Sequence, residues 1–153
     1  QHIKTKMTMK FKIVASRIED EEKLKAAFKI REVVYVDEQK VDREEEFDEF
    51  DKECRHFLVE IDGAPAGTAR WRTTDKGIKL ERFAVLKEFR GKGIGSLLME
   101  AVLEDIHDII EDPKGICYLH AQIDAMPLYA KFGFEPEGEQ FEECNILHQT
   151  MVY

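Results

Sequence analysis

A glycine-rich stretch, RGKGIG at residues 90–95, limits more than any other feature what this chain can fold into. It lies between a run typical of a β-strand, GIKLERFAV at 77–85, and a helical run, SLLMEAVLEDIHDIIED at 96–112. Three glycines in five residues lose extra backbone entropy on folding, so an ordinary unliganded turn explains them poorly. Backbone N–H groups in such a turn, beside a helix N-terminus, attract an anion. The stretch therefore predicts a phosphate-binding turn.

Two common phosphate-binding motifs do not fit this turn. A Rossmann fingerprint needs a third glycine where Ser96 stands, and the acidic residue further on lacks a second β-α-β unit. A Walker loop needs a lysine directly after its last glycine, and none follows Gly95. Both classes of nucleotide-binding protein are therefore excluded.

Length and composition predict one globular domain. The chain has 153 residues with 43% hydrophobic content, and we assign the domain to residues 7–153, leaving 1–6 outside it. The net charge of −9, with no basic stretch, argues against binding to nucleic acid. No apolar run reaches transmembrane length or resembles a signal peptide, so no membrane association is expected. Three widely spaced cysteines fit free thiols in a reducing compartment, and we expect a cytoplasmic protein.

The hydrophobic pattern predicts strands and helices that alternate along the chain. The turn dipeptide Asp62-Gly63 joins two strand-like runs into a hairpin, and Gly133 ends a short helix. The expected strands are 11–16, 56–61, 65–72, 77–85 and 116–122, with one or two more in 141–153; the expected helices are 17–39, 96–112 and 125–132. This order indicates an α/β or α+β domain with a mixed sheet.

The segment LERFAVLKEFRGKGIGSLLMEAVLE, at 80–104, resembles the central motif of the GNAT acyl-CoA-dependent N-acyltransferases. The signature of that family is Arg/Gln-x-x-Gly-x-Gly/Ala, and Arg90, Gly93 and Gly95 fill it. A later Tyr-x-x-x-Gly-Phe pattern of the family is filled by Tyr129 together with the glycine and phenylalanine of LYAKFGF. The stretches REVVYVDEQKV and RWR, with residues in the tail, extend the resemblance to the small bacterial ElaA-like branch over nearly the whole chain.

This resemblance implies a fold, a cosubstrate and a set of contacts. The implied fold is a mixed, mostly antiparallel sheet with a splayed, bulged central strand and flanking helices. The implied cosubstrate is acetyl-CoA, without a metal. Its pantetheine arm would pair with the central strand and its pyrophosphate would lie on the glycine turn. The implied cofactor-binding residues are Phe83, Ala84, Val85, Arg90, Gly91, Lys92, Gly93, Ile94, Gly95, Ser96 and Gln122.

Acyl transfer to an amine also needs proton transfers. The resemblance makes Tyr129 the acid that protonates the departing thiolate, and an N–H near Phe83 the donor to the thioester oxygen. Strand alternation places Glu81 on the same face as Phe83 and Val85, and burial there would raise its pKa, so Glu81 is our first candidate for the base. The alternative for Glu81 is a structural ion pair with a neighbouring arginine: Arg70, Arg72 or Arg82.

Four further residues are candidates for the acceptor side of the site: His56, Arg72, His120 and His148. His120 is also the second candidate for the base. Each cysteine has a histidine nearby, but strand alternation puts Cys117 and His120 on opposite faces, so we expect no zinc site.

An acidic run, DREEEFDEFDKE at 42–53, is typical of a solvated face. It also suggests the hypothesis of a cationic acceptor such as a polyamine.

The sequence thus predicts an N-acyltransferase that moves an acetyl group from acetyl-CoA to a primary amine by direct attack in a ternary complex. The alternative is a non-catalytic sensor that binds CoA or acyl-CoA. The acceptor is a small-molecule amine or a protein amine, and the terminal strand is of a kind that supports homodimers. The sequence leaves open the acceptor's identity, the acyl length, the oligomeric state, and whether the base is Glu81, a histidine or a water chain.

Overall fold

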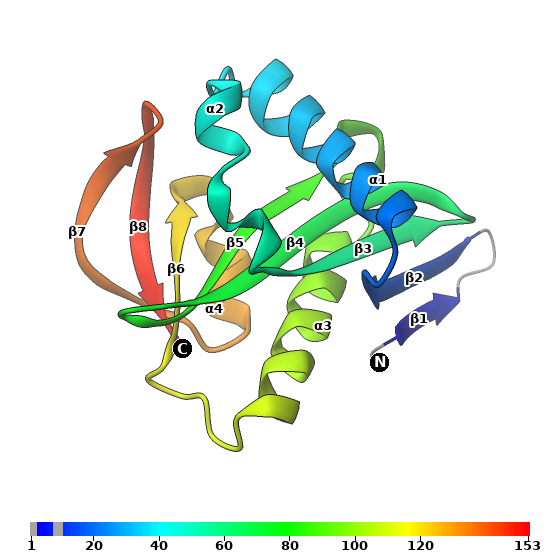
Figure 1. Cartoon of the computed structure of the whole chain (residues 1–153). Helices are drawn as coiled ribbons and strands as arrows, with labels where there is room; N and C mark the ends of the chain where they lie inside the picture. Colours follow the sequence, from blue (N-terminus) through cyan, green and yellow to red (C-terminus); the bar gives the residue numbers. More distant parts are fainter. Residues whose placement is uncertain (1–2, 8–10) are drawn as a thin grey trace.

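The computed structural model describes residues 3–7 and 11–153. Their strands form one eight-stranded sheet of order β1-β2-β3-β4-β5-β6-β8-β7 (Figure 1). The strands are β1 (Ile3–Met7), β2 (Lys12–Arg17), β3 (Arg55–Ile61), β4 (Ala64–Thr74), β5 (Gly77–Val85), β6 (Cys117–Gln122), β7 (Glu135–Glu143) and β8 (Ile146–Val152). The β5–β6 pair is parallel and the other neighbours are antiparallel, which confirms the expected mixed, mostly antiparallel sheet.

Helices cover both faces of this sheet. They are α1 (Glu21–Arg31), the π-helix η1 (Glu32–Glu38), α2 (Arg43–Glu46), α3 (Ile94–Ile109), α4 (Met126–Lys131) and the short 3₁₀ turns η2 (Glu49–Lys52), η3 (Lys87–Phe89) and η4 (Ile123–Ala125). In Figure 1, α1 lies in front of the sheet and α3 behind it.

Two buried apolar clusters hold these layers together. The larger one joins α3, through residues such as Leu98 and Met99, to inward side chains of the sheet such as Phe57. The smaller one joins Ala27 and Ile30 of α1 to the opposite face of the sheet. Burial of apolar area on both faces of β3, β4 and β5 explains why these strands read as nearly continuous apolar runs.

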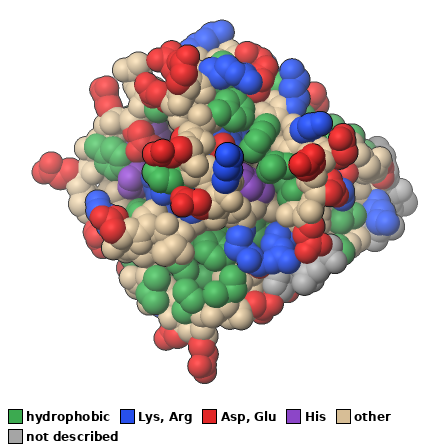
Figure 2. Space-filling view, viewed as in Figure 1, with side chains coloured by type: hydrophobic (Ala, Val, Ile, Leu, Met, Phe, Trp, Pro, Cys, Tyr) green, Lys and Arg blue, Asp and Glu red, His purple; other side chains and the backbone are tan. Residues whose placement is uncertain are grey.

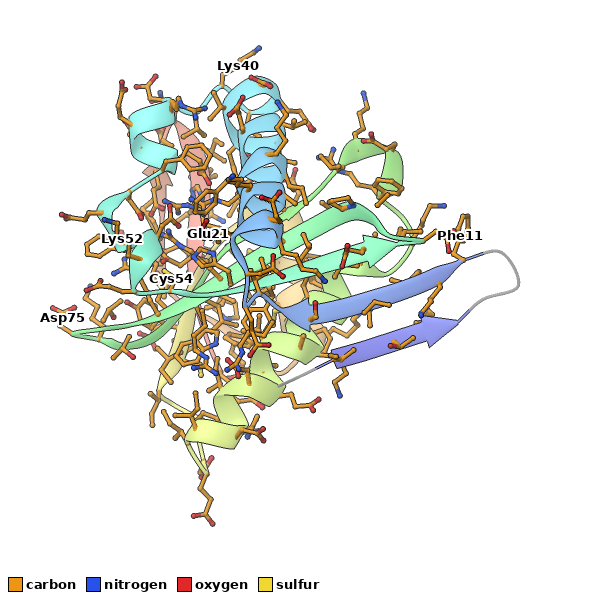
Figure 3. The ribbon with its side chains drawn as sticks, turned by 45° about the vertical axis from the view of Figure 1, so that its right-hand side comes forward. Phe11, Glu21, Lys40, Lys52, Cys54 and Asp75 are labelled. Carbon is orange, nitrogen blue, oxygen red and sulfur yellow. The ribbon has the colours of Figure 1, made fainter. Side chains whose placement is uncertain are left out.

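The helix expected over 17–39 begins later and continues in a different form. Asp20 caps it, because its carboxylate accepts a hydrogen bond of 2.8 Å from the backbone N–H of Lys23. After Arg31 the backbone widens into η1, which ends at Glu38. Figure 3 shows Glu21 and Lys40 near opposite ends of this combined helix.

The hairpin turn at Asp62-Gly63 is confirmed, with φ values of 49° and 83° that suit a two-residue turn. The β7–β8 hairpin has a similar turn at Cys144 and Asn145, with φ values of 52° and 62°. The sequence pattern did not reveal that second turn, because neither residue is a glycine. Residues 3–6, which we left outside the domain, form most of β1 and pair with β2; residues 1 and 2 lie outside the described part.

A bulge in β5 changes which side chains share a face. Thr68 of β4 pairs with Ala84, but Arg70 pairs with Glu81, so β5 holds one extra residue between these points. Arg82 lies there with a φ of 59°, in the left-handed region. As a result, Leu80 belongs to the apolar cluster under α3, whereas Ala84 belongs to the one under α1.

Beyond the bulge, β5 separates from β6. The two strands pair only over Ile78–Leu80 and Cys117–Leu119, and in Figure 1 they diverge toward their C-terminal ends. The splayed, bulged central strand that the resemblance implied is present.

Candidate active site

A cleft of about 390 Å³ opens where β5 and β6 separate. One wall is the second half of β5, and the other is formed by β6, η4 and Tyr129 of α4. Residues of η1, Gln39, Arg90, Glu143 of β7 and His148 of β8 also line it. Among the described residues, β6 has no strand partner on the β5 side beyond Leu119, so this edge can pair with a ligand.

The glycine turn begins at Arg90, which lines the cleft, and runs into the first residues of α3, with Gly93 as the N-cap. Gly91 and Gly93 have φ values of 80° and 77°, which other residues adopt only with strain. A Cβ atom on Gly91 would meet no atom within 4 Å, so that position is open above the backbone. Gly95 differs, because its Cβ would lie 3.0 Å from Leu128 of α4. Gly91 and Gly93 therefore shape the turn, whereas Gly95 lets α3 and α4 pack closely.

Several cationic side chains lie around the turn, among them Lys6 of β1, whose Nζ is 3.8 Å from the position of a Cβ atom on Gly93. The guanidinium of Arg90 forms a double ion pair with Glu38, at 2.7 and 3.0 Å, and its Nε donates to the carbonyl oxygen of Val85. Lys131 donates to the hydroxyl of Ser96 at 2.7 Å. The ammonium of Lys92 lies 4.9 Å from the centre of the Phe11 ring. Arg90 thus ties η1 to β5 and leaves the backbone of the turn open.

Phe83 connects the bulge to both walls of the cleft. Its carbonyl oxygen accepts a hydrogen bond of 2.5 Å from the hydroxyl of Tyr35 in η1. Its ring meets the ring of Tyr129 edge to face, with 5.7 Å between the centroids. Sequence reasoning missed Tyr35. The contact between a tyrosine on a helix and a strand distant in sequence becomes visible only once the packing of the two elements is known.

Tyr129 is 7% exposed, and burial raises the pKa of its phenol above the usual value. No hydrogen-bond partner for its hydroxyl appears among residues 3–7 and 11–153. The phenol is therefore protonated at neutral pH and has a free O–H group at the cleft.

Glu81 does not have the environment that we expected. Burial alone would raise its pKa, but the charge of Arg70 and a hydrogen bond from Arg72 outweigh that effect and lower the pKa to about 2. The Arg72 Nε atom is 2.7 Å from Oε1, and the Lys79 Nζ atom is 3.1 Å from Oε2. The expectation of a raised pKa was wrong, and the ion-pair alternative describes this carboxylate.

The bulge also corrects the expected orientation of Glu81. The side chain of Glu81 points with Arg70 toward the face that α1 covers, whereas Phe83 packs against the apolar cluster under α3. The two residues therefore do not share a face. An uninterrupted strand would have placed them together, and the extra residue near Arg82 reverses the alternation.

Behind Glu81 lies a buried charge network that sequence reasoning also missed. Arg31 and Arg70, which are 1% and 0% exposed, both donate to Asp51 of η2. Arg31 also pairs with Glu46, and Arg70 with Asp48. Each buried guanidinium thus has carboxylate partners, as burial of a charge requires. The network fixes the acidic run to the sheet face, and part of that run is therefore structural rather than a solvated surface. Other Asp and Glu side chains are spread over the outer surface of the molecule (Figure 2).

The two histidines of the C-terminal strands line the cleft. His120 places Nδ1 3.0 Å from Oε2 of Glu143, and that contact lowers the pKa of Glu143. His148 places Nδ1 2.6 Å from the carbonyl oxygen of Ile146. A carboxylate or carbonyl oxygen can only accept, so Nδ1 of each ring is assigned as the donor, and in the neutral form of the ring Nε2 is the nitrogen that can accept a proton. Glu143 is a further cleft residue that the sequence did not reveal.

The other candidates lie elsewhere or have structural partners. His56 does not line the cleft: it faces a separate surface pocket, its Nε2 lies 2.9 Å from the carbonyl oxygen of Asp51, and desolvation lowers its pKa. Arg72 stacks 4.0 Å from the centre of the Phe50 ring and reaches the cleft only through Glu81. Gln122 does line the cleft and donates to Gln39 at 2.8 Å, which joins β6 to the end of η1.

No three His, Cys, Asp or Glu side chains among residues 3–7 and 11–153 converge as metal ligands. Within the same ranges, no helix has both the length and the apolar character needed to cross a membrane.

Comparison with known proteins gives a consistent result. Residues 17–153 match the family described as the acetyltransferase (GNAT) domain. Over 134 residues the chain is 40% identical to YjcF, an uncharacterized N-acetyltransferase of Bacillus subtilis strain 168, covering 87% of this chain and 94% of that protein.

Solved structures share the fold. ElaA of Escherichia coli superimposes with a TM-score of 0.80 at 25% identity, covering 92% of this chain and 99% of that one. A GNAT family acetyltransferase from Elizabethkingia anophelis, solved with acetyl-CoA bound, has a TM-score of 0.63 at 16% identity over 92% of this chain and 94% of its own. At that lower identity the likeness shows the fold alone.

Proposed function

This chain belongs to the GNAT acetyltransferase family, and from that premise we propose that it transfers an acetyl group from acetyl-CoA to a primary amine. The amine attacks the thioester directly while both substrates are bound. The single observation that carries the proposal is the cleft where β5 and β6 separate, with a glycine turn that begins at Arg90 in its lining and a protonated tyrosine in its wall.

The donor has a suitable binding surface on this chain. Backbone N–H groups of residues 90–96 and the N-terminus of α3 would hold the pyrophosphate. The amide-rich pantetheine arm would run along Phe83, Ala84 and Val85 and form main-chain hydrogen bonds as an added strand does. The N–H groups of this edge are also available to the thioester oxygen, on which negative charge develops during attack.

The proton transfers are assigned to the two walls. A bound ammonium loses one proton to a histidine, and the resulting amine forms a C–N bond with the thioester carbon. Collapse of the tetrahedral intermediate breaks the C–S bond, and the departing thiolate takes a proton from Tyr129. The nitrogen loses a second proton, which restores the phenol of Tyr129. The products are the acetamide and CoA thiol, and the histidine releases one proton to water.

The histidines of the cleft suit the first step better than Glu81 does. A carboxylate with a pKa of about 2 that contacts three cationic side chains is a weak base. His120 and His148 line the cleft and have Nε2 available to accept a proton. We assign Glu81 to positioning: it holds Arg70 and Arg72 beside the bulge.

Calorimetric titration with acetyl-CoA, with NAD and ATP as controls, tests the binding half of the proposal. Specific binding of acetyl-CoA is expected. A screen of amines that follows release of the CoA thiol then tests the catalytic half. A folded protein that ignores acetyl-CoA would contradict the whole proposal. Binding without thiol release for any amine would instead favour the CoA sensor. The three free cysteines fit a reducing compartment, and we infer a cytoplasmic enzyme.

A further inference from the structure

The cleft of the candidate active site has an apolar side and a polar side. Side chains of β6 alternate between the two: Leu119 belongs to the apolar cluster under α3, whereas His120, the next residue, lies on the opposite face of the strand. The lining residues on the apolar side belong to that cluster or pack against it: Leu80, Phe83, Leu119 and Tyr129. The polar side includes Lys79, His120 and Glu143. A ligand in the cleft therefore meets hydrocarbon on one side and charged groups on the other.

The apolar side ends where the two strands rejoin. Leu80 pairs with Leu119, and this is the last pair of the short parallel contact between β5 and β6. Both side chains are 2% exposed, and both line the cleft. Beyond this pair the strands diverge (Figure 1). We call Leu80 and Leu119 the leucine floor, because together they close the apolar side of the cleft at its inner end.

The proposed donor would approach the leucine floor with its acyl end first. With the pyrophosphate at residues 90–96, the pantetheine arm follows Val85, Ala84 and Phe83, and thus runs toward the start of β5. The thioester then lies near Phe83, whose ring contacts the ring of Tyr129. An acyl chain on that thioester continues in the same direction, toward Leu80. Its hydrocarbon is stabilised on the apolar side of the cleft, whereas the polar side suits the amine.

We propose that Leu80 and Leu119 set the length of the acyl group that the protein accepts, and that they favour acetyl over longer chains. This inference rests on the proposed acetyl transfer. The strand pair and the cluster under α3 hold both side chains, so a longer chain would have to displace part of a packed core. One methylene group too many in a closed apolar pocket typically changes discrimination by about 10- to 200-fold.

Donor binding tests this proposal without turnover. The wild-type protein is titrated calorimetrically with acetyl-CoA, propionyl-CoA and butyryl-CoA, and affinity should fall by about tenfold or more from acetyl-CoA to butyryl-CoA. Leu119→Ala removes more carbon atoms from the floor than the two methylene groups by which butyryl exceeds acetyl. In that variant butyryl-CoA should bind at least as tightly as acetyl-CoA.

A matched control separates the floor from a general loosening of the core. Leu98 is 0% exposed and belongs to the same apolar cluster, but it is not a lining residue of the cleft. Leu98→Ala therefore makes the same truncation elsewhere in the cluster and should keep the wild-type order of affinities. Leu119→Val and Leu80→Val make smaller cavities, so they test the proposal even where Leu119→Ala does not fold. Each should reduce the discrimination against propionyl-CoA by about threefold or more, and urea unfolding shows which variants are folded.

The outcomes separate this inference from the proposed function. Equal affinity of the wild-type protein for acetyl-CoA and butyryl-CoA would overturn the inference. So would folded floor variants that keep the wild-type order, or a Leu98→Ala variant that relaxes it equally. Thiol release from acetyl-CoA in the presence of an amine reports on acetyl transfer alone. If that release occurs while the floor variants keep the wild-type order, acetyl transfer stands and the leucine floor is rejected. A wild-type protein that binds none of the three thioesters would instead contradict the proposed function itself.

Discussion

The hydroxyl of Tyr35 donates to the carbonyl oxygen of Phe83 across 2.5 Å, which ties the π-helix η1 to the bulge of β5. A π-helix places its side chains differently from an α-helix of the same length, and such widenings are frequent at functional sites. Here the π-helix places the hydroxyl of Tyr35 beside the carbonyl oxygen of Phe83, a residue that lines the cleft. The hydrogen bond therefore connects the shape of the first helix to the shape of the proposed acetyl-CoA site.

Replacing Tyr35 with phenylalanine should relax the bulge. We expect unfolding free energy to fall by about 1 kcal/mol, because one buried hydrogen bond is lost, and affinity for acetyl-CoA to fall as well. Tyr118→Phe is the matched control, since the hydroxyl of Tyr118 meets Thr74 at 2.6 Å at the far end of the sheet. Urea unfolding and calorimetry measure both quantities. Equal acetyl-CoA affinity in the two variants would contradict the role given to Tyr35.

Two glycines, one in the glycine turn and one shortly before β6, occupy equally strained backbone positions. Gly91 and Gly115 have φ values of 80° and 81°, and a Cβ atom on either meets nothing within 4 Å. Alanine at either site should lower stability by about 1 kcal/mol through backbone strain. Only Gly91→Ala should weaken acetyl-CoA binding, because its added methyl group keeps phosphate away from the backbone. Calorimetric titration of both variants checks this, and equal weakening would show that strain alone matters.

Tyr129→Phe should slow acetyl transfer by about 10²–10³-fold while acetyl-CoA affinity stays within twofold, because only the proton donor is lost. Tyr153→Phe is the control: its hydroxyl meets His107 at 3.0 Å, outside the cleft. Thiol-release kinetics combined with calorimetry separate rate from binding. An unchanged kcat in the Tyr129→Phe variant would show that Tyr129 does not protonate the leaving thiolate.

Glu81 should affect stability in a pH-dependent way. Its pKa is lowered to about 2 in the folded protein, from about 4.3 in an unfolded chain. A lowered pKa adds stability above the unfolded value, and that stability is lost as the pH falls through the folded value. The stability gap between wild type and Glu81→Gln should therefore be largest at neutral pH and shrink between about pH 4.3 and pH 2. Urea unfolding across this range measures the gap, and a gap that widens toward acid would refute the ion-pair assignment.

The two cleft histidines should differ in their effect on rate. His148→Gln is expected to lower kcat by about 10²-fold or more and to flatten the acid limb of the pH–rate profile, because the proton acceptor is lost. His107→Gln, at an exposed site, should leave both unchanged. If His120→Gln lowers kcat and His148→Gln does not, the base is His120.

Local chemistry made much of the fold predictable. The Asp62-Gly63 turn, the apolar run of β5 and the glycine turn before α3 each have causes that lie within a few residues. Those features were found at or close to their expected positions. Gly95 was expected in the phosphate site, but the feature that requires its missing side chain is Leu128, which is distant in sequence.

The predictions that differ from the structure share a different cause, which is contact between residues distant in sequence. The orientation of Glu81 relative to Phe83 depends on one extra residue in β5, which packing against Tyr35 and the acidic run stabilises. His56 was expected near the other histidines, but β3 pairs with β4 at a register that carries it to another surface. Arg31 and Arg70 are usual surface residue types, and only their carboxylate partners, distant in sequence, make them core residues.

The short parallel contact between Ile78–Leu80 and Cys117–Leu119 has a mechanical consequence. It divides the sheet into two parts, which we call plates. One plate contains β1 to β5, the other contains β6, β8 and β7, and the short β5–β6 pairing is the hinge between them. Few main-chain hydrogen bonds fix the angle between the plates, so packing in the apolar cluster under α3, which includes Leu119 and Met151 as well as Phe57, contributes much of what holds it. A molecule bridging both plates acts as a brace that fixes this angle. The binding free energy of such a molecule then includes the cost of fixing the hinge. The protein with this molecule bound should therefore unfold at a higher temperature or denaturant concentration than the protein without it.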